Sequence, residues 1–248
     1  MLFDGEVAII TGGAQGIGKA IAEEFCAEGA ISVLFDINQE KGEACVAEIK
    51  ETGGNARFVQ CDITNVREIE RHVKSVAEEY GRIDILVNNA GILHTTPIED
   101  ITEEEWDRMM AINLKSVFFM SQKVLPYFRK QKGGKVVNIS SLAGRMGGIA
   151  NGLGYTASKA GIIGLTYGFA NRLAGENINV NAIAPGTTAT DILKAIPAEK
   201  IAELKASMPL KRFGTPHDIA NAVVFLASSK ASFITGAVLD VNGGMFVG

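Results

Sequence analysis

The sequence predicts an α/β fold, a doubly wound, seven-stranded parallel sheet with helices on both faces. Short apolar runs alternate with longer amphipathic stretches along the whole chain, which is typical of parallel strands joined by crossover helices. No repeat, low-complexity tract or long linker interrupts this alternation. Residues 1–248 are therefore expected to form a single domain.

Seven apolar runs are the predicted strands. They are EVAII (6–10), ISVLFD (31–36), ARFVQCD (56–62), IDILVNNAG (83–91), KVVNIS (135–140), INVNAIAPG (178–186) and AVLDVNGG (237–244). The stretches between them are predicted helices, at about 16–29, 39–52, 66–80, 103–129, 155–174 and within 190–228. Segment 187–212 follows the carboxyl end of a strand and has helical spacing without a strong apolar stripe, so it is predicted to be a substrate lid.

Composition excludes several classes of protein. With 47% hydrophobic and 21% charged residues, the chain matches globular rather than disordered, collagenous or coiled-coil sequences. A net charge of −4 gives no basic footprint for nucleic acid or an anionic membrane. The first apolar run is short and reads as a strand rather than a signal peptide, and no run approaches the ~20 residues of a membrane-spanning helix. We expect a cytoplasmic protein with a small-molecule substrate.

Cysteines and histidines are too scattered to indicate a metal site. The three cysteines are odd in number and widely spaced, which predicts free thiols rather than a disulfide framework; they are Cys26, Cys45 and Cys61. The three histidines also lack ligand spacing; they are His72, His94 and His217. The sequence therefore predicts no metal and does not support zinc-dependent alcohol chemistry.

A glycine-rich turn, TGGAQGIG (11–18), joins the first strand to the first helix. Gly12 permits a sharp turn, Gly16 lets backbone amides approach a pyrophosphate, and Gly18 lets the helix pack closely on the strand. The amino end of the helix then favours the anion. Gln15 and Ile17 complete the candidate phosphate loop. The spacing departs from the usual G-x-G-x-x-G, so this motif alone is weak.

Asp36 strengthens the dinucleotide hypothesis. It ends the second strand about 20 residues after the turn, where dinucleotide-binding proteins place the acid that binds the adenosine ribose hydroxyls. A carboxylate there repels a 2′-phosphate. Gln15 and Ile37 supply no cation to hold that phosphate. The sequence therefore favours NAD(H) over NADP(H).

Two further strand ends carry candidate cofactor contacts. Asp62 is placed to accept a hydrogen bond from the adenine amino group, with Ile63 against the ring, although a turn-forming aspartate is nearly as good an explanation. The fourth strand ends in Asn88 and the candidate contacts Asn89, Ala90 and Gly91, which can tie strand ends together and leave room for a ribose.

Tyr155 and Lys159 lie four residues apart in a predicted helix, so their side chains share one face. A free tyrosine has a pKa near ~10, too high for an efficient base at neutral pH, but a nearby ammonium or oxidised nicotinamide favours the phenolate. Ser141 follows the fifth strand and is a candidate donor to the same substrate oxygen. Tyr155 thus becomes a candidate acid/base for interconverting a secondary alcohol and a ketone.

Together these motifs resemble the short-chain dehydrogenase/reductase family over almost the whole chain, with a Rossmann-type fold. The matching residues are TGGAQGIG, Asp36, Asp62, NNAG, Asn113, Ser141, Tyr155, Lys159 and APGTTAT (184–190). The resemblance implies a catalytic tetrad of Asn113, Ser141, Tyr155 and Lys159, with Asn113 placing a water that joins Lys159 to a proton relay. It also implies that Tyr155 and Lys159 contact the cofactor, Lys159 through the nicotinamide ribose. The residues it implies around the nicotinamide are Pro185, Gly186, Thr188 and Thr190.

Within the family, the chain is similar to 3-oxoacyl-carrier-protein reductases and to NAD-linked sugar or polyol dehydrogenases. We expect a small hydroxy or keto substrate, such as a sugar or polyol derivative, contacted by His94, Thr95, segment 145–154 and the lid. The first alternative is carrier-protein reduction, with Lys130 and Lys132 as candidate basic contacts. The second is a dinucleotide sensor without turnover. The resemblance also implies a homotetramer, which the family commonly forms through its fifth and sixth helices and final strand.

Overall fold

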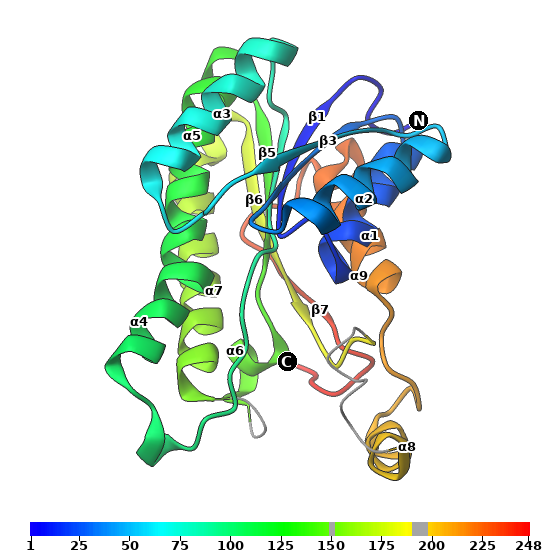
Figure 1. Cartoon of the computed structure of the whole chain (residues 1–248), viewed down its shortest axis with the longest axis vertical. Coiled ribbons are helices and arrows are strands. Elements are labelled where there is room, and N and C mark those ends of the chain that lie inside the picture. Colours follow the sequence, from blue (N-terminus) through cyan, green and yellow to red (C-terminus); the bar gives the residue numbers. More distant parts are fainter. Residues whose placement is uncertain (149–151, 190–197) are drawn as a thin grey trace.

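The computed structural model describes residues 1–148, 152–189 and 198–248. It contains a seven-stranded sheet in the order β3-β2-β1-β4-β5-β6-β7, and every strand pair is parallel (Figure 1). This confirms the predicted doubly wound α/β fold. The strands are β1 (Val7–Thr11), β2 (Ile31–Asp36), β3 (Asn55–Gln60), β4 (Ile85–Asn88), β5 (Gly134–Ile139), β6 (Ile178–Pro185) and β7 (Val238–Val241).

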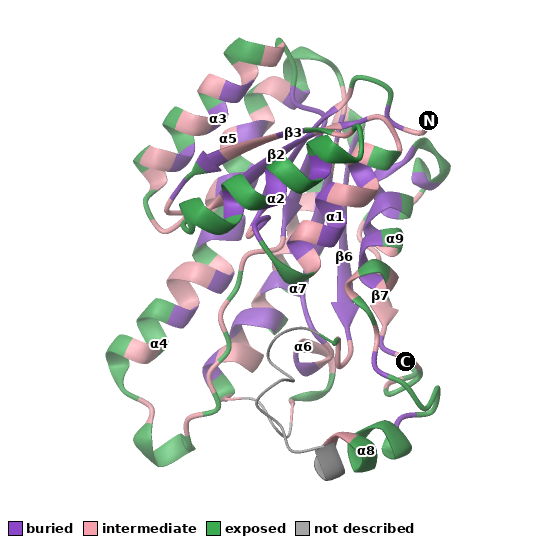
Figure 2. Cartoon of the chain, turned by 45° about the vertical axis from the view of Figure 1, so that its right-hand side comes forward, coloured by how far each residue is buried: buried purple, intermediate pink, exposed green. Residues whose placement is uncertain are grey.

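Helices cover both faces of the sheet. One layer contains α1 (Gly16–Ala27), α2 (Gln39–Glu51) and α9 (Pro216–Ala227), and the other contains α3 (Val66–Tyr80), α5 (Ser116–Lys130) and α7 (Leu153–Leu173). Figure 2 shows that the strands are mostly buried and that the helices expose only their outer faces. Because central parallel strands are covered on both sides, they read as continuous apolar runs, which is why the sequence locates them well.

The predicted helix near 103–129 is present, but it is not α-helical throughout. It consists of α4 (Glu103–Met110), the π-helical turn η2 (Ala111–Lys115) and α5. The structure also adds a short helix, α6 (Leu142–Met146), directly after β5. Within the predicted lid, 190–197 lie outside the described residues and α8 (Ala198–Ser207) follows them.

Strand order places the site. Chain order runs β1-β2-β3 in one direction and β4 to β7 in the other, so connections leave β1 and β4 toward opposite sides. Ligands of such sheets bind at the carboxyl ends of the strands near this reversal. The glycine turn follows β1, NNAG ends β4, and Ser141 follows β5, so the motifs meet at one edge. None of the described helices is long and apolar enough to cross a membrane.

Candidate active site

The glycine turn closes tightly against the residues after β4. Gly12 adopts a φ of +64°, and a Cβ on it would lie 2.9 Å from the Ala90 Cα. A Cβ on Gly18 would lie only 2.0 Å from the Gly12 carbonyl oxygen. Gly16 also has a positive φ, +57°, just where α1 begins. The backbone therefore forms a close turn, which we call the glycine cradle, in which any side chain at Gly12 or Gly18 would clash. A turn of this kind fits the pyrophosphate of a dinucleotide.

Asn89 holds this cradle together. Its Nδ2 donates to the carbonyl oxygens of Thr11 and Gly12, both at 3.0 Å, and the backbone N–H groups of Asn89 and Ala90 donate to Thr11 Oγ1. Asn88 instead points into the sheet and donates to Asn138 Oδ1 at 2.8 Å. The asparagine pair thus ties strands together, as the sequence suggested.

Asp36 turns its carboxylate toward the glycine turn. Its Oδ2 accepts the Ala14 N–H at 3.2 Å, and its Oδ1 accepts the Asn38 N–H at 3.0 Å. Lys41 also reaches this region and hydrogen-bonds the Gln15 side chain. Gln15 and Ile37 supply no cation themselves, but α2 brings Lys41 to the turn. Sequence spacing does not reveal this contact.

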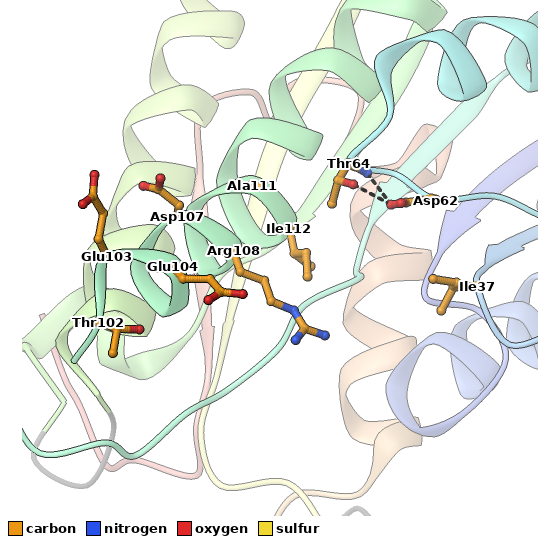
Figure 3. Close-up of a pocket in the computed structure, with 10 residues that line it drawn as sticks. All are labelled: Ile37, Asp62, Thr64, Thr102, Glu103, Glu104, Asp107, Arg108, Ala111 and Ile112. Atoms are coloured by element: carbon orange, nitrogen blue, oxygen red, sulfur yellow. Dashed lines mark hydrogen bonds between the residues drawn. The ribbon is translucent and has the colours of Figure 1, made fainter. Parts of the chain in front are cut away.

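Asp62 forms a turn, the alternative that the sequence left open. Its Oδ1 accepts from the backbone N–H of Thr64 at 2.9 Å and from its hydroxyl at 2.7 Å. Asp62, Ile37 and Thr64 also line a pocket of about 950 Å³ whose opposite wall is α4 and η2, with Arg108 pointing into it (Figure 3). Ile63 is half-buried against the core. The pocket lies at the expected adenosine end, away from Tyr155.

Asn113 is the buried centre of the π-helical turn. Its Nδ2 donates to the Ile92 carbonyl at 2.9 Å, and its Oδ1 accepts the Ile92 N–H at 2.8 Å. A Cβ on Gly91 would lie 3.3 Å from Asn113 Oδ1 and 3.4 Å from Lys159 Nζ. The π turn thus brings Asn113 beside Lys159. Such turns are frequent at functional sites, but the sequence marks this one only by an asparagine within a helix.

Ser141 and Tyr155 are brought together by α6 and α7. Ser141 caps α6, where its Oγ accepts the Ala143 N–H at 3.1 Å. A Cβ on Gly144 would lie 2.7 Å from the Lys159 carbonyl carbon, so α6 packs backbone to backbone on α7. Burial raises the pKa of Tyr155, and a hydrogen bond with the Ser141 side chain lowers it.

Lys159 is fully enclosed. Its Nζ donates to the Ile139 carbonyl at 2.8 Å and lies 5.7 Å from the centre of the Tyr155 ring. Burial lowers the pKa of Lys159 to about 8. In the chain without cofactor, burial outweighs the hydrogen bond to Ser141, so the pKa of Tyr155 is raised. That Lys159 and a bound oxidised nicotinamide favour the phenolate stays a prediction. An ammonium that stabilises the phenolate remains available only while Lys159 is protonated.

The end of β6 supplies the remaining candidate contacts. Pro185 is buried, and the Gly186 N–H donates to the Val241 carbonyl at 3.0 Å. Thr188 Oγ1 donates to the Gly186 carbonyl at 3.2 Å. Thr190 lies outside the described residues, as do 149–151 of the substrate segment. Ile17 is half-buried and packs on the core of α1.

Three basic residues near the candidate substrate contacts have different surroundings. Arg145, in the candidate substrate segment, is a half-buried partner of Asp240 at 3.3 Å. Lys130 ends α5 and Lys132 precedes β5, so both lie at the amino ends of the strands, the edge opposite Ser141. Within this chain, these lysines do not border the candidate site.

Comparisons with known proteins agree with this geometry. A family model described as "Enoyl-(Acyl carrier protein) reductase" matches residues 12–246. The chain is 40% identical over 247 residues to the 3-oxoacyl-[acyl-carrier-protein] reductase FabG of Thermotoga maritima, covering all of both proteins. It is 42% identical over 243 residues to that of Staphylococcus aureus, covering 97% of this chain and 98% of the relative. The crystal structure of gox2181 superposes on this chain with a TM-score of 0.94 and 34% sequence identity. The match covers 98% of this chain and 96% of the gox2181 chain.

Proposed function

Because the chain belongs to the short-chain dehydrogenase/reductase family, we propose that it reduces the 3-oxo group of an acyl thioester carried on acyl carrier protein. It is an NAD(P)-dependent oxidoreductase that acts on a CH–OH group. The names of the relatives favour the carrier-protein substrate over the sugar or polyol derivative expected from the sequence. In reduction, the product is the 3-hydroxyacyl thioester.

The observation that carries this proposal is the meeting of Ser141, Tyr155 and Lys159 after β5, beside the glycine cradle. When bound, the nicotinamide supplies a hydride to the carbonyl carbon. Ser141 donates a hydrogen bond to the substrate oxygen, and Tyr155 transfers its hydroxyl proton to that oxygen. Lys159 holds the nicotinamide ribose and, through a water placed by Asn113, passes a proton from solvent back to the phenolate.

The residues at the ribose support NAD(H) as the preferred cofactor. Both Asp36 oxygens accept backbone hydrogen bonds, which hold a negative charge where a 2′-phosphate would lie. Lys41 opposes this effect, since its ammonium is close enough to contact Gln15. We expect the carboxylate to dominate, because a 2′-phosphate must approach it directly.

The substrate is tested with purified protein, NADH and three probes: a 3-oxoacyl thioester of acyl carrier protein, the matching trans-2-enoyl thioester, and a panel of sugars and polyols with NAD. We expect turnover of the first only. The enoyl probe lacks an oxygen on its reacting carbon for Ser141 and Tyr155 to address, and the names of the relatives favour the carrier-protein substrate over polyols. Turnover confined to polyols would restore the original expectation. Turnover of the enoyl probe alone would contradict oxo reduction, and tight NADH binding without any turnover would identify a sensor.

The cofactor is tested by comparing kcat/KM for NADH and NADPH. Asp36→Asn keeps one of the two backbone acceptors, for the Ala14 or the Asn38 N–H, and removes the charge, so NADPH use should rise relative to NADH by about tenfold or more. Lys41→Ala is the matched control and should lower NADPH use. If the ratio of kcat/KM for NADH to kcat/KM for NADPH were unchanged in the Asp36→Asn variant, the Asp36 carboxylate would not determine cofactor preference.

Three wider expectations belong to this proposal. Segment 187–212 is the substrate lid, following Pro185 and Gly186 at the reacting end. The protein acts in the cytoplasm, where its small-molecule cofactor is available. It forms a homotetramer.

A further inference from the structure

A cysteine, a glutamate and a histidine converge outside the site described above. Cys61 follows β3, and Glu68 and His72 lie one turn apart on α3. One potential ligand atom from each residue lies within 4.8 Å of the other two. A thiol, an imidazole and a carboxylate are the donor types found at zinc sites, and three protein ligands leave a position for solvent.

The neighbouring structure fixes all three residues. Cys61 is buried, and its N–H donates to the Asp36 carbonyl at 3.0 Å, which anchors it at the edge of β2. The His72 ring meets Phe35 edge to face, with 6.1 Å between the ring centres. Glu68 lies on the same face of α3 as His72 because of the four-residue spacing. The backbone positions are set by these contacts, and the donor atoms, within 4.8 Å of one another, would close around one ion by side-chain rotation.

His72 has an unprotonated ring nitrogen that faces a cation. Its Nε2 lies 2.9 Å from Arg71 Nη2. A guanidinium nitrogen can only donate, so Nε2 accepts and carries no proton in this contact. Arg71 is exposed and can turn toward solvent when a cation replaces it.

We propose that Cys61, Glu68 and His72 bind one Zn²⁺ ion at a site coupled to the adenosine end of the cofactor site. Coordination replaces the thiol proton of Cys61, and that proton leaves to solvent. Glu68 Oε2 accepts the Asp62 N–H at 3.0 Å. Zinc that shares this carboxylate weakens its bond to Asp62, and the turn facing the adenosine pocket loosens. The coupling rests on the proposed cofactor function, whereas the zinc site does not.

The site is tested by titrating the nucleotide-free protein with Zn²⁺ against a chromophoric chelator, and with Co²⁺ for thiolate-to-metal absorption. We expect one ion per chain and a thiolate band. Cys61→Ser and His72→Ala should each weaken Zn²⁺ binding by at least about tenfold. Cys26→Ser, which alters a half-buried thiol elsewhere, should bind as the parent does.

Glu68→Gln keeps an acceptor for the Asp62 N–H on the partly exposed surface of α3, so it serves if Cys61→Ser does not fold. It should also weaken Zn²⁺ binding. The proposal is overturned if the parent protein binds no Zn²⁺, or if the substituted proteins bind it equally well.

The coupling is tested by measuring NADH affinity with and without Zn²⁺. We expect Zn²⁺ to weaken NADH binding to the parent protein at least about fivefold and to leave His72→Ala unaffected, and NADH should weaken Zn²⁺ binding by the same factor. An NADH affinity insensitive to bound Zn²⁺ would overturn the coupling. Failure of NADH to bind in the absence of Zn²⁺ would instead contradict the proposed function.

Discussion

At the scale of single residues, Tyr155 is expected to carry the proton transfer. Tyr155→Phe removes the hydroxyl and leaves the ring in its half-buried place beside Ser141. We expect kcat to fall by at least about 10²–10⁴-fold, the usual contribution of general acid–base catalysis, with NADH affinity nearly unchanged. Stopped-flow turnover and fluorescence titration measure the two quantities. Activity that survives in the variant would refute the assignment.

The lowered pKa of Lys159 should make the free energy of unfolding depend on pH. Its pKa falls from 10.5 to about 8 on folding, so the ammonium costs about 3 kcal/mol at neutral pH. Between pH 8 and 10.5 the unfolded chain binds more protons, so the wild type gains stability as pH rises, and below 8 the full cost remains. Lys159→Met should therefore unfold at a higher urea concentration than the wild type at pH 7. Its free energy of unfolding should be greater by roughly 2 kcal/mol, because the loss of the hydrogen bond to Ile139 offsets part of the gain.

The advantage of Lys159→Met should shrink toward pH 10, where the wild-type lysine is neutral. Urea unfolding of both proteins at pH 7 and pH 10, without nucleotide, gives the comparison. An equal difference at both pH values would contradict the assigned cost.

The spacing of Tyr155 and Lys159 is visible in the sequence, but their pKa shifts could not be predicted from it, because desolvation depends on what α6 and β5 bury around them.

At the scale of elements, the contact between α6 and α7 positions the catalytic groups. Gly144→Ala places a methyl group 2.7 Å from the Lys159 carbonyl carbon, so α6 must move away and take Ser141 with it. We expect kcat to fall about 10–100-fold, while NADH affinity changes little because the glycine turn is distant. Gly175→Ala is the control, since nothing lies within 4 Å of its added methyl group. Equal effects of the two substitutions would contradict this positioning role.

The elements also show where sequence patterns fail. All seven strands begin and end within a few residues of their predicted positions, because buried apolar runs are bounded by glycine and polar residues. The helix over 103–129 is confirmed, but its π-helical turn at 111–115 leaves the apolar pattern unchanged, so the sequence does not show it. The five-residue helix α6 is shorter than the period needed to detect it. Both missed elements hold candidate catalytic residues, Asn113 and Ser141.

In the whole molecule, the order of neighbouring strands and the contacts between distant segments could not be predicted from the sequence. Alternating strands and helices predict a parallel sheet but not that β1 lies between β2 and β4. The contact of Lys41 with Gln15 and the cluster of Cys61, Glu68 and His72 depend on how α2 and α3 pack at the sheet edge. Residues that meet only through such packing leave no spacing signal.

Phe118 and Phe233 are two of the exposed aromatic side chains on the described surface. Phe118 on α5 is 37% exposed and packs with Phe119 and Phe169, and Phe233 near β7 is fully exposed. Exposed aromatic groups of this kind mark interfaces when they recur in patches. Phe118 lies on the fifth helix and Phe233 shortly before the final strand, two of the elements through which the resemblance to the family implies assembly. We therefore expect two distinct interfaces between copies of the chain.

Light scattering should give a mass about four times the 26.3 kDa of the chain. Phe118→Asp and Phe233→Asp should each yield dimers, because each charge is buried in one interface and leaves the other intact. Phe233 is fully exposed in the chain, so its replacement alone costs a monomer less than about 0.5 kcal/mol. Ile98→Asp, at an exposed position before α4, should remain tetrameric. A monomeric parent protein would contradict the expected tetramer. Dissociation of the Ile98→Asp variant would show that Phe118 and Phe233 do not mark the interfaces.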